Sequence, residues 1–479
     1  MIRKASLCLG FLLGGVFHSI ALASEERMAP LRFDEVLRSV TAHDPRIRKA
    51  VEGLRRAESN TMQARGAFDP RVEGDAALRT GAYYDLRRAD VELRQATTLW
   101  GSEIYAGYRV GLARNDRWPT YLEDQTLSGG EVRAGIDMPI WRGGPIDEPR
   151  AKRARALALE EAARHDLSGM ELNLELAAAG AYWKWVSTGQ KLEVTRGLLR
   201  LAEERDGQLR RRLAAGSIAE FDVTDNERIL FERRALLVAA ERAFEQAAFE
   251  LSLFLRDSQG QSVVPGSSRL PADQELPSGQ EPVEALVMER VLMCHPDLRQ
   301  VRAQLDAAEV DVALTKNQLA PDIKALFQYS RDLGELTGTD LDFTLPGNVF
   351  KVGVQLSMPL PFRSERGRAG IARAEVAQTE AEARFLEDQL TARVRDAASA
   401  VRAAQERVEL TQEIVETAVE LAEGERRRFD VGASNLIFVN LREQQAAMAK
   451  MQLIEAIAIV QIERTRWDTT TRVECGRGG

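Results

Sequence analysis

The stretch Asn348–Phe362, NVFKVGVQLSMPLPF, decides the fold of this chain. Small or polar residues occupy every second position, and the residues between them are apolar: Phe350, Val352, Val354, Leu356 and Met358. A period of two is typical of a β-strand with one apolar and one polar face. We therefore predict a strand over residues 348–358.

The same pattern occurs far upstream. Residues 130–139 also close on Met-Pro and have their own apolar series, which is Val132, Ala134, Ile136 and Met138. An earlier strand is predicted in each case, at residues 70–79 and 321–330. The interval from Pro45 to Pro70 equals that from Pro296 to Pro321, so the chain is predicted to be a duplicated unit.

The first copy is longer between its two strands. Its surplus, about residues 80–128, can supply a further hairpin with strands Leu86–Ala96 and Glu103–Leu112, turning at Trp100-Gly101. The sequence does not place this hairpin. Without it, each copy supplies one hairpin and the chain four strands.

Long helices follow the hairpins, at Ile146–Leu213 and Ser364–Phe429. They are rich in Ala, Arg, Glu and Leu, and apolar residues spaced by three and four from Val394 to Ala422 predict a coiled-coil seam. Each long helix ends at a glycine turn, residues 213–218 and 429–435, because glycine supplies the left-handed cap. Shorter helices then return to about Arg256 and Trp467.

Helix lengths predict the architecture. At 1.5 Å per residue the long helices span roughly 100 Å, and the others reach roughly 50 to 60 Å. Two short helices placed end to end therefore match one long helix. We expect a wall of such helices, with the strands at one end and the glycine turns at the other.

The N-terminus resembles an export signal. Residues 1–23 contain Arg3 and Lys4, an apolar run, and Ala21-Leu22-Ala23 as a cleavage site. No later stretch is apolar enough for a membrane helix. The formal charge is −8, which does not suggest a nucleic-acid partner. An exported chain of this kind is either soluble or held in the outer membrane through strands.

Residues suited to catalysis or metal binding are sparse. His43, His165 and His295 are scattered, and no phosphate loop or nucleophile motif occurs, so we expect neither an enzyme nor a cofactor or metal site. His43 and His295 precede the proline-started helices, where a solvated or capping role is expected. Cys294 and Cys475 can form a disulfide, but unpaired thiols are the favoured interpretation.

Four strands cannot close a barrel alone, because membrane barrels begin at eight strands. Three chains would supply twelve strands and a water-filled lumen. The apolar strand residues would then face lipid: Val132, Ala134, Ile136, Phe350, Val352, Val354 and Leu356. Aromatic residues at the strand ends suit the membrane interface: Phe68, Trp141 and Phe362.

In the order, duplication and spacing of these motifs, the chain resembles the outer-membrane efflux protein family, the TolC-like channels. The residues that carry the resemblance are Pro45-Arg46-Ile47 and Pro296-Asp297-Leu298, the residues after each Met-Pro, and the turns at Gly216 and Gly432. The resemblance implies a mainly α homotrimer with a transmembrane β-barrel in outer-membrane lipid and a periplasmic α-helical barrel. It also implies a periplasmic adaptor (a membrane fusion protein) and an inner-membrane pump as partners.

The resemblance assigns adaptor docking to the tip turns, at Gly216, Ser217, Gly432 and Ala433. It also assigns the closed aperture to this end. Asp222 matches the aspartate of the family's polar aperture bond, but Phe429 and Ser434 stand where Tyr and Arg are expected. Phe438 and Leu441 occupy positions of acidic lumen rings. They can form an apolar constriction instead, or simply pack in the core.

The predicted organisation is a signal peptide (1–23), a first efflux repeat (24–256), a linker (257–280), a second repeat (281–468) and a C-terminal tail (469–479). The favoured function is a passive exit duct of a tripartite multidrug efflux pump or a type I secretion system. A metal-ion efflux duct is an alternative within transport. A periplasmic coiled-coil scaffold or adaptor with soluble sheets is the alternative from another class.

Overall fold

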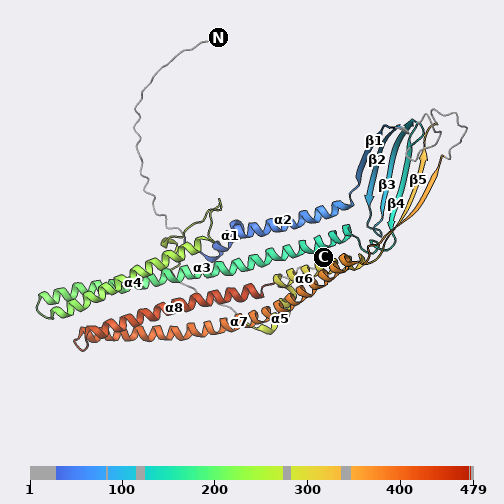
Figure 1. Cartoon of the computed structure of the whole chain (residues 1–479). Coiled ribbons are helices and arrows are strands. Elements are labelled where there is room, and N and C mark those ends of the chain that lie inside the picture. The colour runs from blue at the N-terminus through green and yellow to red at the C-terminus, as the bar shows by residue number, and fades with distance from the viewer. Residues whose placement is uncertain are drawn as a thin grey trace, which may run out of the picture.

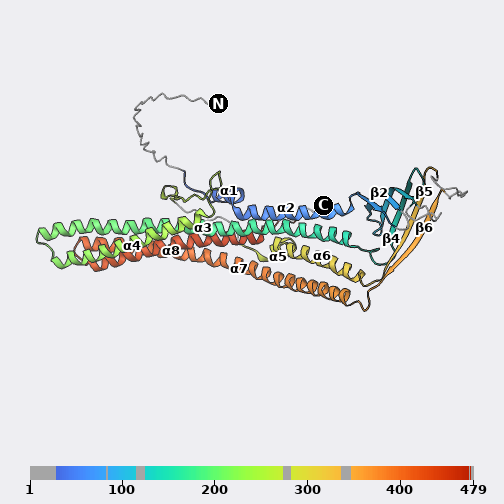
Figure 2. The same ribbon diagram turned by 45° about the horizontal axis from the view of Figure 1, so that its top comes forward.

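The chain folds into one elongated body with a β-sheet at one end and two helical turns at the other (Figure 1). The computed structural model describes residues 29–81, 85–114, 125–272, 282–335, 347–473 and 475. The predicted signal peptide lies outside the described residues. The two views agree that the long helices run side by side between the two ends (Figures 1 and 2).

The helices repeat in the two halves of the chain. The first half contains α1 (Phe33–His43), α2 (Pro45–Arg65), α3 (Glu148–Ala214) and α4 (Glu220–Ser252). The second half contains α5 (Glu284–Cys294), α6 (Pro296–Asn317), α7 (Arg363–Asp430) and α8 (Leu436–Thr471). Two short 3₁₀ turns add η1 (Gly66–Phe68) and η2 (Ser267–Arg269). The 67 residues of α3 and 68 of α7 confirm the two predicted long helices.

Each proline-started helix begins with a side-chain cap. The Asp44 carboxylate accepts a hydrogen bond from the Arg46 amide (2.8 Å), and His295 Nδ1 accepts one from the Asp297 amide (3.3 Å). The capping role expected for His295 is therefore confirmed. His43 lies exposed in the last turn of α1, in agreement with the solvated role that was the other expectation, and Asp44 supplies the cap of α2.

The long helix α3 forms the spine of the body. It packs against α2 and α6 toward the sheet, and against α4 and α8 toward the glycine turns. Thr61 of α2 donates to the Ala156 carbonyl (3.2 Å), and Lys191 pairs with Glu455 of α8 (2.8 Å). Helix α7 runs likewise beside α6 and α8. The predicted stacking of two short helices along one long helix is confirmed.

The largest buried cluster lies where α1, α3 and α4 meet near the middle of the body. Trp185 is fully buried there and packs with Leu31, Val36, Leu251 and neighbouring apolar residues. The Tyr182 hydroxyl donates to the Leu31 carbonyl (2.8 Å), so the segment before α1 is fixed to α3. This cluster anchors the first repeat at the level where α2 gives way to α4.

The described strands form a single antiparallel sheet. They are β1 (Arg71–Arg79), β2 (Asp85–Ala96), β3 (Glu103–Arg114), β4 (Glu131–Pro139), β5 (Asp322–Asp332) and β6 (Val349–Ser357), and each pairs with the next along the chain. The extra hairpin is confirmed as β2 and β3. Trp100 and Gly101 both have positive φ in its turn.

The expectation of four strands per chain is wrong. Among the described residues β2 and β3 lie within the sheet, between β1 and β4, so the sheet has six strands. The first copy contributes a four-stranded meander rather than one hairpin, because β1 pairs with β2 over its whole length. The two repeats join where β4 pairs with β5.

Cys294 and Cys475 form a disulfide, with their Cα atoms 5.0 Å apart. The favoured interpretation of unpaired thiols is therefore wrong. The bond joins the end of α5 to the segment after α8, and Val473 packs beside Cys294 in the same apolar cluster. It closes a loop of 181 residues, a separation at which sequence alone does not indicate pairing.

Candidate functional site

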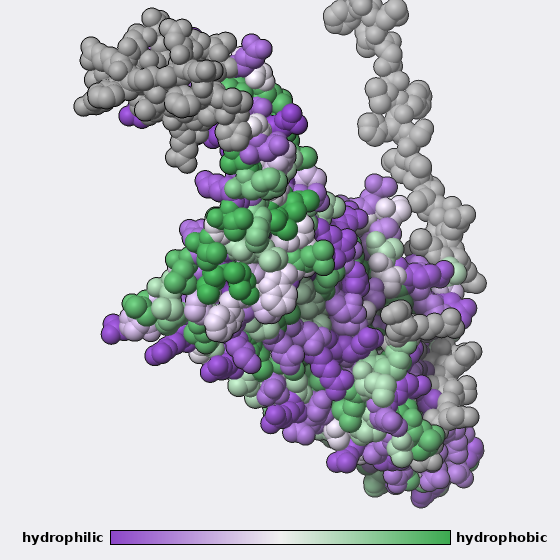
Figure 3. All heavy atoms as spheres, turned by 90° about the vertical axis from the view of Figure 1, so that its right-hand side faces the viewer, coloured by the Kyte–Doolittle hydropathy of each residue, from purple (hydrophilic) through white to green (hydrophobic). Residues whose placement is uncertain are grey.

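One face of the sheet is apolar and exposed. Strand register aligns Val72 with Leu93, Ala106 with Ala134, and Phe327 with Val352, so the apolar series of all strands fall on the same side. Val354 and Phe350 are 70% and 78% exposed in the single chain. Figure 3, which views the sheet end, shows hydrophobic residues gathered in a band. All seven residues predicted to face lipid lie on this face.

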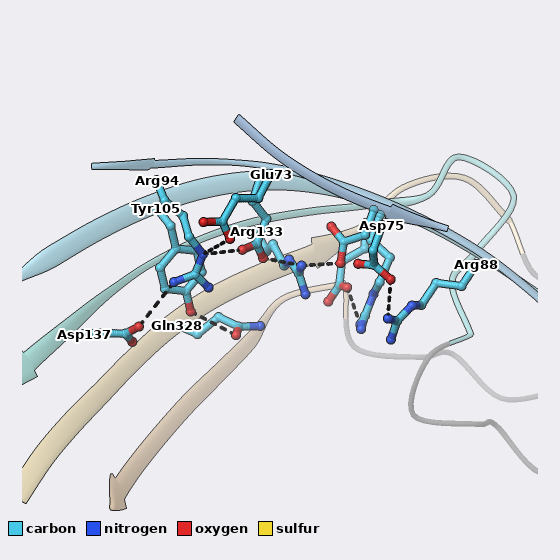
Figure 4. A network of polar contacts seen from close by, with 12 residues as sticks. Glu73, Asp75, Arg88, Arg94, Tyr105, Arg133, Asp137 and Gln328 are labelled. Atoms are coloured by element: carbon cyan, nitrogen blue, oxygen red, sulfur yellow. Dashed lines mark hydrogen bonds and ion pairs between the residues drawn. The ribbon is translucent and has the colours of Figure 1, made fainter. Parts of the chain in front are cut away.

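The opposite face of the sheet is crossed by a network of charged and polar side chains. Arg94 of β2 lies at its centre and pairs with Glu92 (2.9 Å), Glu103 (3.0 Å) and Asp137 (3.6 Å) (Figure 4). Its guanidinium also lies over the Tyr105 ring, 4.8 Å from the centroid. Contacts of this kind connect neighbouring strands on the side away from the apolar face.

The network continues to both sides of Arg94. Arg133 of β4 contacts both Asp90 and Glu92 of β2, and the Tyr105 hydroxyl donates to Gln328 of β5 (3.1 Å) (Figure 4). Arg88 pairs with Asp75 of β1 (2.6 Å). Five strands therefore contribute to one polar surface, in which the charges shown are largely paired with opposite charges. A sheet with this polar surface on one side and a bare apolar surface on the other is suited to a boundary between water and lipid.

Aromatic residues lie at the helix-side end of the sheet, as predicted. Phe68 ends η1 just before β1, and Trp141, which is exposed, follows β4. Phe362 caps α7 and has a left-handed backbone, with φ of 64°. Their positions suit an interface, and this role remains a prediction.

Both helical hairpins turn through the same backbone motif. Gly216 and Gly432 have φ of +70° and +78°, and an added Cβ would meet nothing within 4 Å at either position. In each turn the glycine amide and the next amide bond back to carbonyls of the last helical turn: Gly216 to Leu213 (2.8 Å), Ser217 to Arg212 (2.9 Å), Gly432 to Phe429 (3.0 Å) and Ala433 to Arg428 (2.8 Å). The positive φ explains why glycine is needed in both turns.

The predicted aperture residues are only partly brought together. Phe429 packs in an apolar cluster with Leu209, Val223 and Leu436, while Asp222 accepts a hydrogen bond from the Ala219 amide (3.3 Å) at the start of α4. The Ser434 hydroxyl bonds to Glu425.

Phe438 and Leu441 are 52% and 45% exposed in the single chain. They are therefore not core residues of this chain, and they remain candidates for a constriction.

A buried charge cluster that sequence reasoning missed lies above the turns. Glu443 of α8 is 5% exposed, and it bonds to Arg205 of α3 and to Arg426 of α7 (2.9 Å). Arg233 of α4 lies 3.5 Å from its other oxygen. One carboxylate thus contacts arginines of all three neighbouring helices.

Two of the arginines have further partners. Arg205 donates to Asn440 Oδ1 and Arg233 to the Leu198 carbonyl (2.7 Å), and both side chains are buried. We call Glu443, Arg205, Arg233, Arg426 and Asn440 the Glu443 cluster. A signal was present in the sequence, because Asn440 and Glu443 interrupt the apolar spacing Leu436, Val439, Ala446.

Burial alone would raise the pKa of the Glu443 carboxyl. The hydrogen bonds and positive charges of Arg205 and then Arg426 outweigh burial and hold that pKa below its ordinary value. Burial lowers the pKa of Arg233, and the charge of Glu443 opposes this effect. The carboxylate is therefore ionised at neutral pH and compensates charges that would otherwise be buried unpaired.

We expect Glu443→Gln to lower the free energy of unfolding by about 3 to 5 kcal/mol, because it leaves buried arginines uncompensated. The matched control is Glu455→Gln, which removes the exposed pair with Lys191 between the same two helices and should cost under about 1 kcal/mol. Urea unfolding followed by circular dichroism measures both. Equal losses in the two variants would contradict the prediction.

The same cluster predicts a pH dependence. Since the folded-state pKa of Glu443 is lowered, its contribution to stability is complete above the ordinary value of 4.5 and is lost as pH falls through the folded-state value. The stability difference between the wild type and Glu443→Gln should therefore shrink below pH 4.5. Unfolding curves at a series of pH values test this, and a constant difference would contradict it.

No helix within the described residues is long and apolar enough to cross a membrane. In the same part of the chain, no group of three or more His, Cys, Asp or Glu side chains is arranged to hold a metal ion.

Comparisons with known proteins agree with this geometry. Residues 287–466 match the family model "Outer membrane efflux protein". A search of curated protein sequences finds no match.

Solved structures with the same fold include the outer-membrane channel OprN, at 16% identity and a TM-score of 0.65, covering 92% of this chain and 90% of that one. The outer membrane protein VceC of Vibrio cholerae matches at 16% identity and 0.64, covering 92% and 96%. The CmeC outer membrane channel of Campylobacter jejuni matches at 12% and 0.65, covering 93% and 87%.

The resemblance drawn from the sequence is thereby confirmed, as is the mainly α fold class. The outer-membrane location predicted from the sequence agrees with the family match. Residues 287–466 match the outer membrane efflux protein family model, and over 92% of its length the chain has the fold of the solved outer-membrane channels OprN and VceC.

Proposed function

We propose that this protein is the passive exit duct of an efflux or secretion assembly, working as a homotrimer in the outer membrane. The observation that carries the proposal is the bare apolar face of the sheet, joined to a helical body whose long helices span roughly 100 Å. The sheet would meet lipid, and the helices would reach into the periplasm. An inner-membrane transporter and an adaptor would supply energy and cargo.

The tip residues have assigned roles in this proposal. Gly216, Ser217, Gly432 and Ala433 would contact the adaptor, and Phe438 and Leu441 would narrow the lumen. The Glu443 cluster supports a role in gating, because it joins α3 and α4 to α7 and α8 close to the turns. Opening the tip by moving one helical pair away from the other would separate Glu443 from Arg205.

Extraction separates this proposal from a periplasmic scaffold. A duct should sediment with outer membranes and require detergent, whereas a scaffold should be released by osmotic shock. Co-purification of an inner-membrane ABC-type transporter would indicate a secretion system, and a proton-driven pump would indicate a tripartite efflux pump.

We expect Val354→Arg to destabilise the protein in its membrane by about 2 to 4 kcal/mol, because it places a charge on the lipid face. Gln355→Arg is the matched control, since it is the same change one residue on, on the opposite face. Unfolding in urea from lipid vesicles measures both. Val354→Arg with the stability of the control would count against a lipid-facing sheet.

We expect Gly216→Val and Gly432→Val to weaken adaptor coupling while sparing membrane insertion. A β-branched residue at positive φ costs about 1 to 2 kcal/mol and would distort the turn. Gly424→Val is the matched control, because Gly424 lies in α7 with ordinary helical φ and open space around it. Adaptor pull-down and a cellular export assay are the measurements, and full coupling in both tip variants would refute the role.

A further inference from the structure

We infer that the β2–β3 hairpin is an integral part of the channel wall, so that three copies close a barrel of eighteen strands rather than the twelve expected from the sequence. This inference rests on the proposed function. Each free edge of the sheet then has one partner, because β6 of one copy pairs with β1 of a second copy. The hairpin thereby widens the lumen.

The order of the strands places the hairpin inside the sheet. β1 and β4 are separated by β2 and β3, and every neighbouring pair is hydrogen-bonded along most of its length. A ring that left out the hairpin would have to break the β3–β4 pairing and bring β1 or an adjacent copy against β4. In lipid each unpaired backbone group costs several kcal/mol, so the continuous sheet is favoured.

The two free edges are suited to each other. β1 and β6 are both nine residues long, and neither has a second partner among the described strands. With six strands alternating in direction, β6 of one copy runs antiparallel to β1 of the next. If Arg71 is set level with Ser357, Val72 lies opposite Leu356, Gly74 opposite Val354 and Leu78 opposite Phe350. The apolar faces of both copies are then continuous.

The flanks of the helical body favour the same neighbour. α2, which leads into β1, packs against α3, as does α4, whereas α7, which follows β6, packs against α6 and α8. Large apolar side chains are exposed on both flanks, namely Phe221, Phe231, Val238 and Phe249 of α4 and Ile371, Phe385, Leu410 and Ile414 of α7. A ring that joins β6 to β1 would also bring these two apolar flanks together, and this head-to-tail contact closes on itself.

The added strands also determine what lines the wider lumen. β2 supplies Arg94, Glu92 and Asp90, which anchor the polar network on the face away from lipid (Figure 4). Barrel diameter grows roughly linearly with strand number, so eighteen strands give about 2.2-fold the cross-section of twelve. A water-filled lumen of this size, lined by charges of both signs, suits large hydrated cargo such as folded or partly folded polypeptide.

Cysteine pairing across the free edges tests the contact between β6 and β1 that the inference requires. Full-length protein carrying Gly74→Cys together with Val352→Cys, Val354→Cys or Leu356→Cys is oxidised in the outer membrane and resolved on a non-reducing gel. An added side chain at Gly74 meets only ordinary contacts, at 3.6 and 3.9 Å, and Cys294 and Cys475 are already paired with each other. We expect one register to convert most of the monomer into linked products that end at three chains.

Two control cysteine pairs test which faces and which strands meet. Gly74→Cys with Gly353→Cys should give no linked product, because Gly353 lies on the other face of β6. Ala134→Cys with Val354→Cys should give none either, because β4 is internal in an eighteen-stranded ring. Linkage through Ala134, or no linkage from Gly74 in an oligomer extracted from the outer membrane, would overturn the inference and leave the proposed function standing. Wild-type protein absent from that membrane would overturn both.

A second measurement tests whether the β2–β3 hairpin itself lies in the ring. A fluorophore on Val91→Cys, on the apolar face of β2, should be quenched by brominated lipid chains at least as strongly as one on Val354→Cys. A fluorophore on Lys351→Cys, on the polar face of β6, is the unquenched control. A hairpin outside the ring would leave the Val91 label unquenched, which would contradict the inference.

Discussion

The structure depends on backbone hydrogen bonds between neighbouring strands of a sheet whose apolar side chains point outward. In water such a face would be covered by other elements, but here no described helix packs over it. In hydrocarbon the face is satisfied, provided that no strand edge is left open. In the proposed membrane location, the two open edges of this chain would pair with copies of itself, and the helical bodies of those copies would form part of the same ring.

Duplication explains how one chain builds both ends of the body. Each repeat runs from a capped short helix into strands, then along a long helix to a glycine turn, and back. The repeats are joined by β4 against β5 in the sheet, by α3 against α6 and α8 along the helical body, and by the Glu443 cluster near the turns. The junction in the sheet uses backbone hydrogen bonds, whereas the junction near the turns uses buried charges, which are specific to one arrangement of the four helices.

Much of this was predictable from local pattern. The alternation from Phe350 to Met358 gave the apolar face, and Gly216 and Gly432 marked the turns, because each feature is determined by neighbouring residues. The place of the β2–β3 hairpin, the Cys294–Cys475 bond and the partners of Glu443 depend on contacts far apart in sequence. Periodicity predicts elements but not which edges pair, and for that reason the strand number was wrong.

Continuity of α3 and α7 past the ends of their shorter neighbours has a mechanical consequence. At mid-height, where α2 gives way to α4 and α6 to α8, α3 and α7 are the described helices that continue without a break. A twisting force applied at the two glycine turns would therefore reach the sheet through α3 and α7. Bending is expected to concentrate at that level, where the Cys294–Cys475 bond joins the segment after α8 to the end of α5.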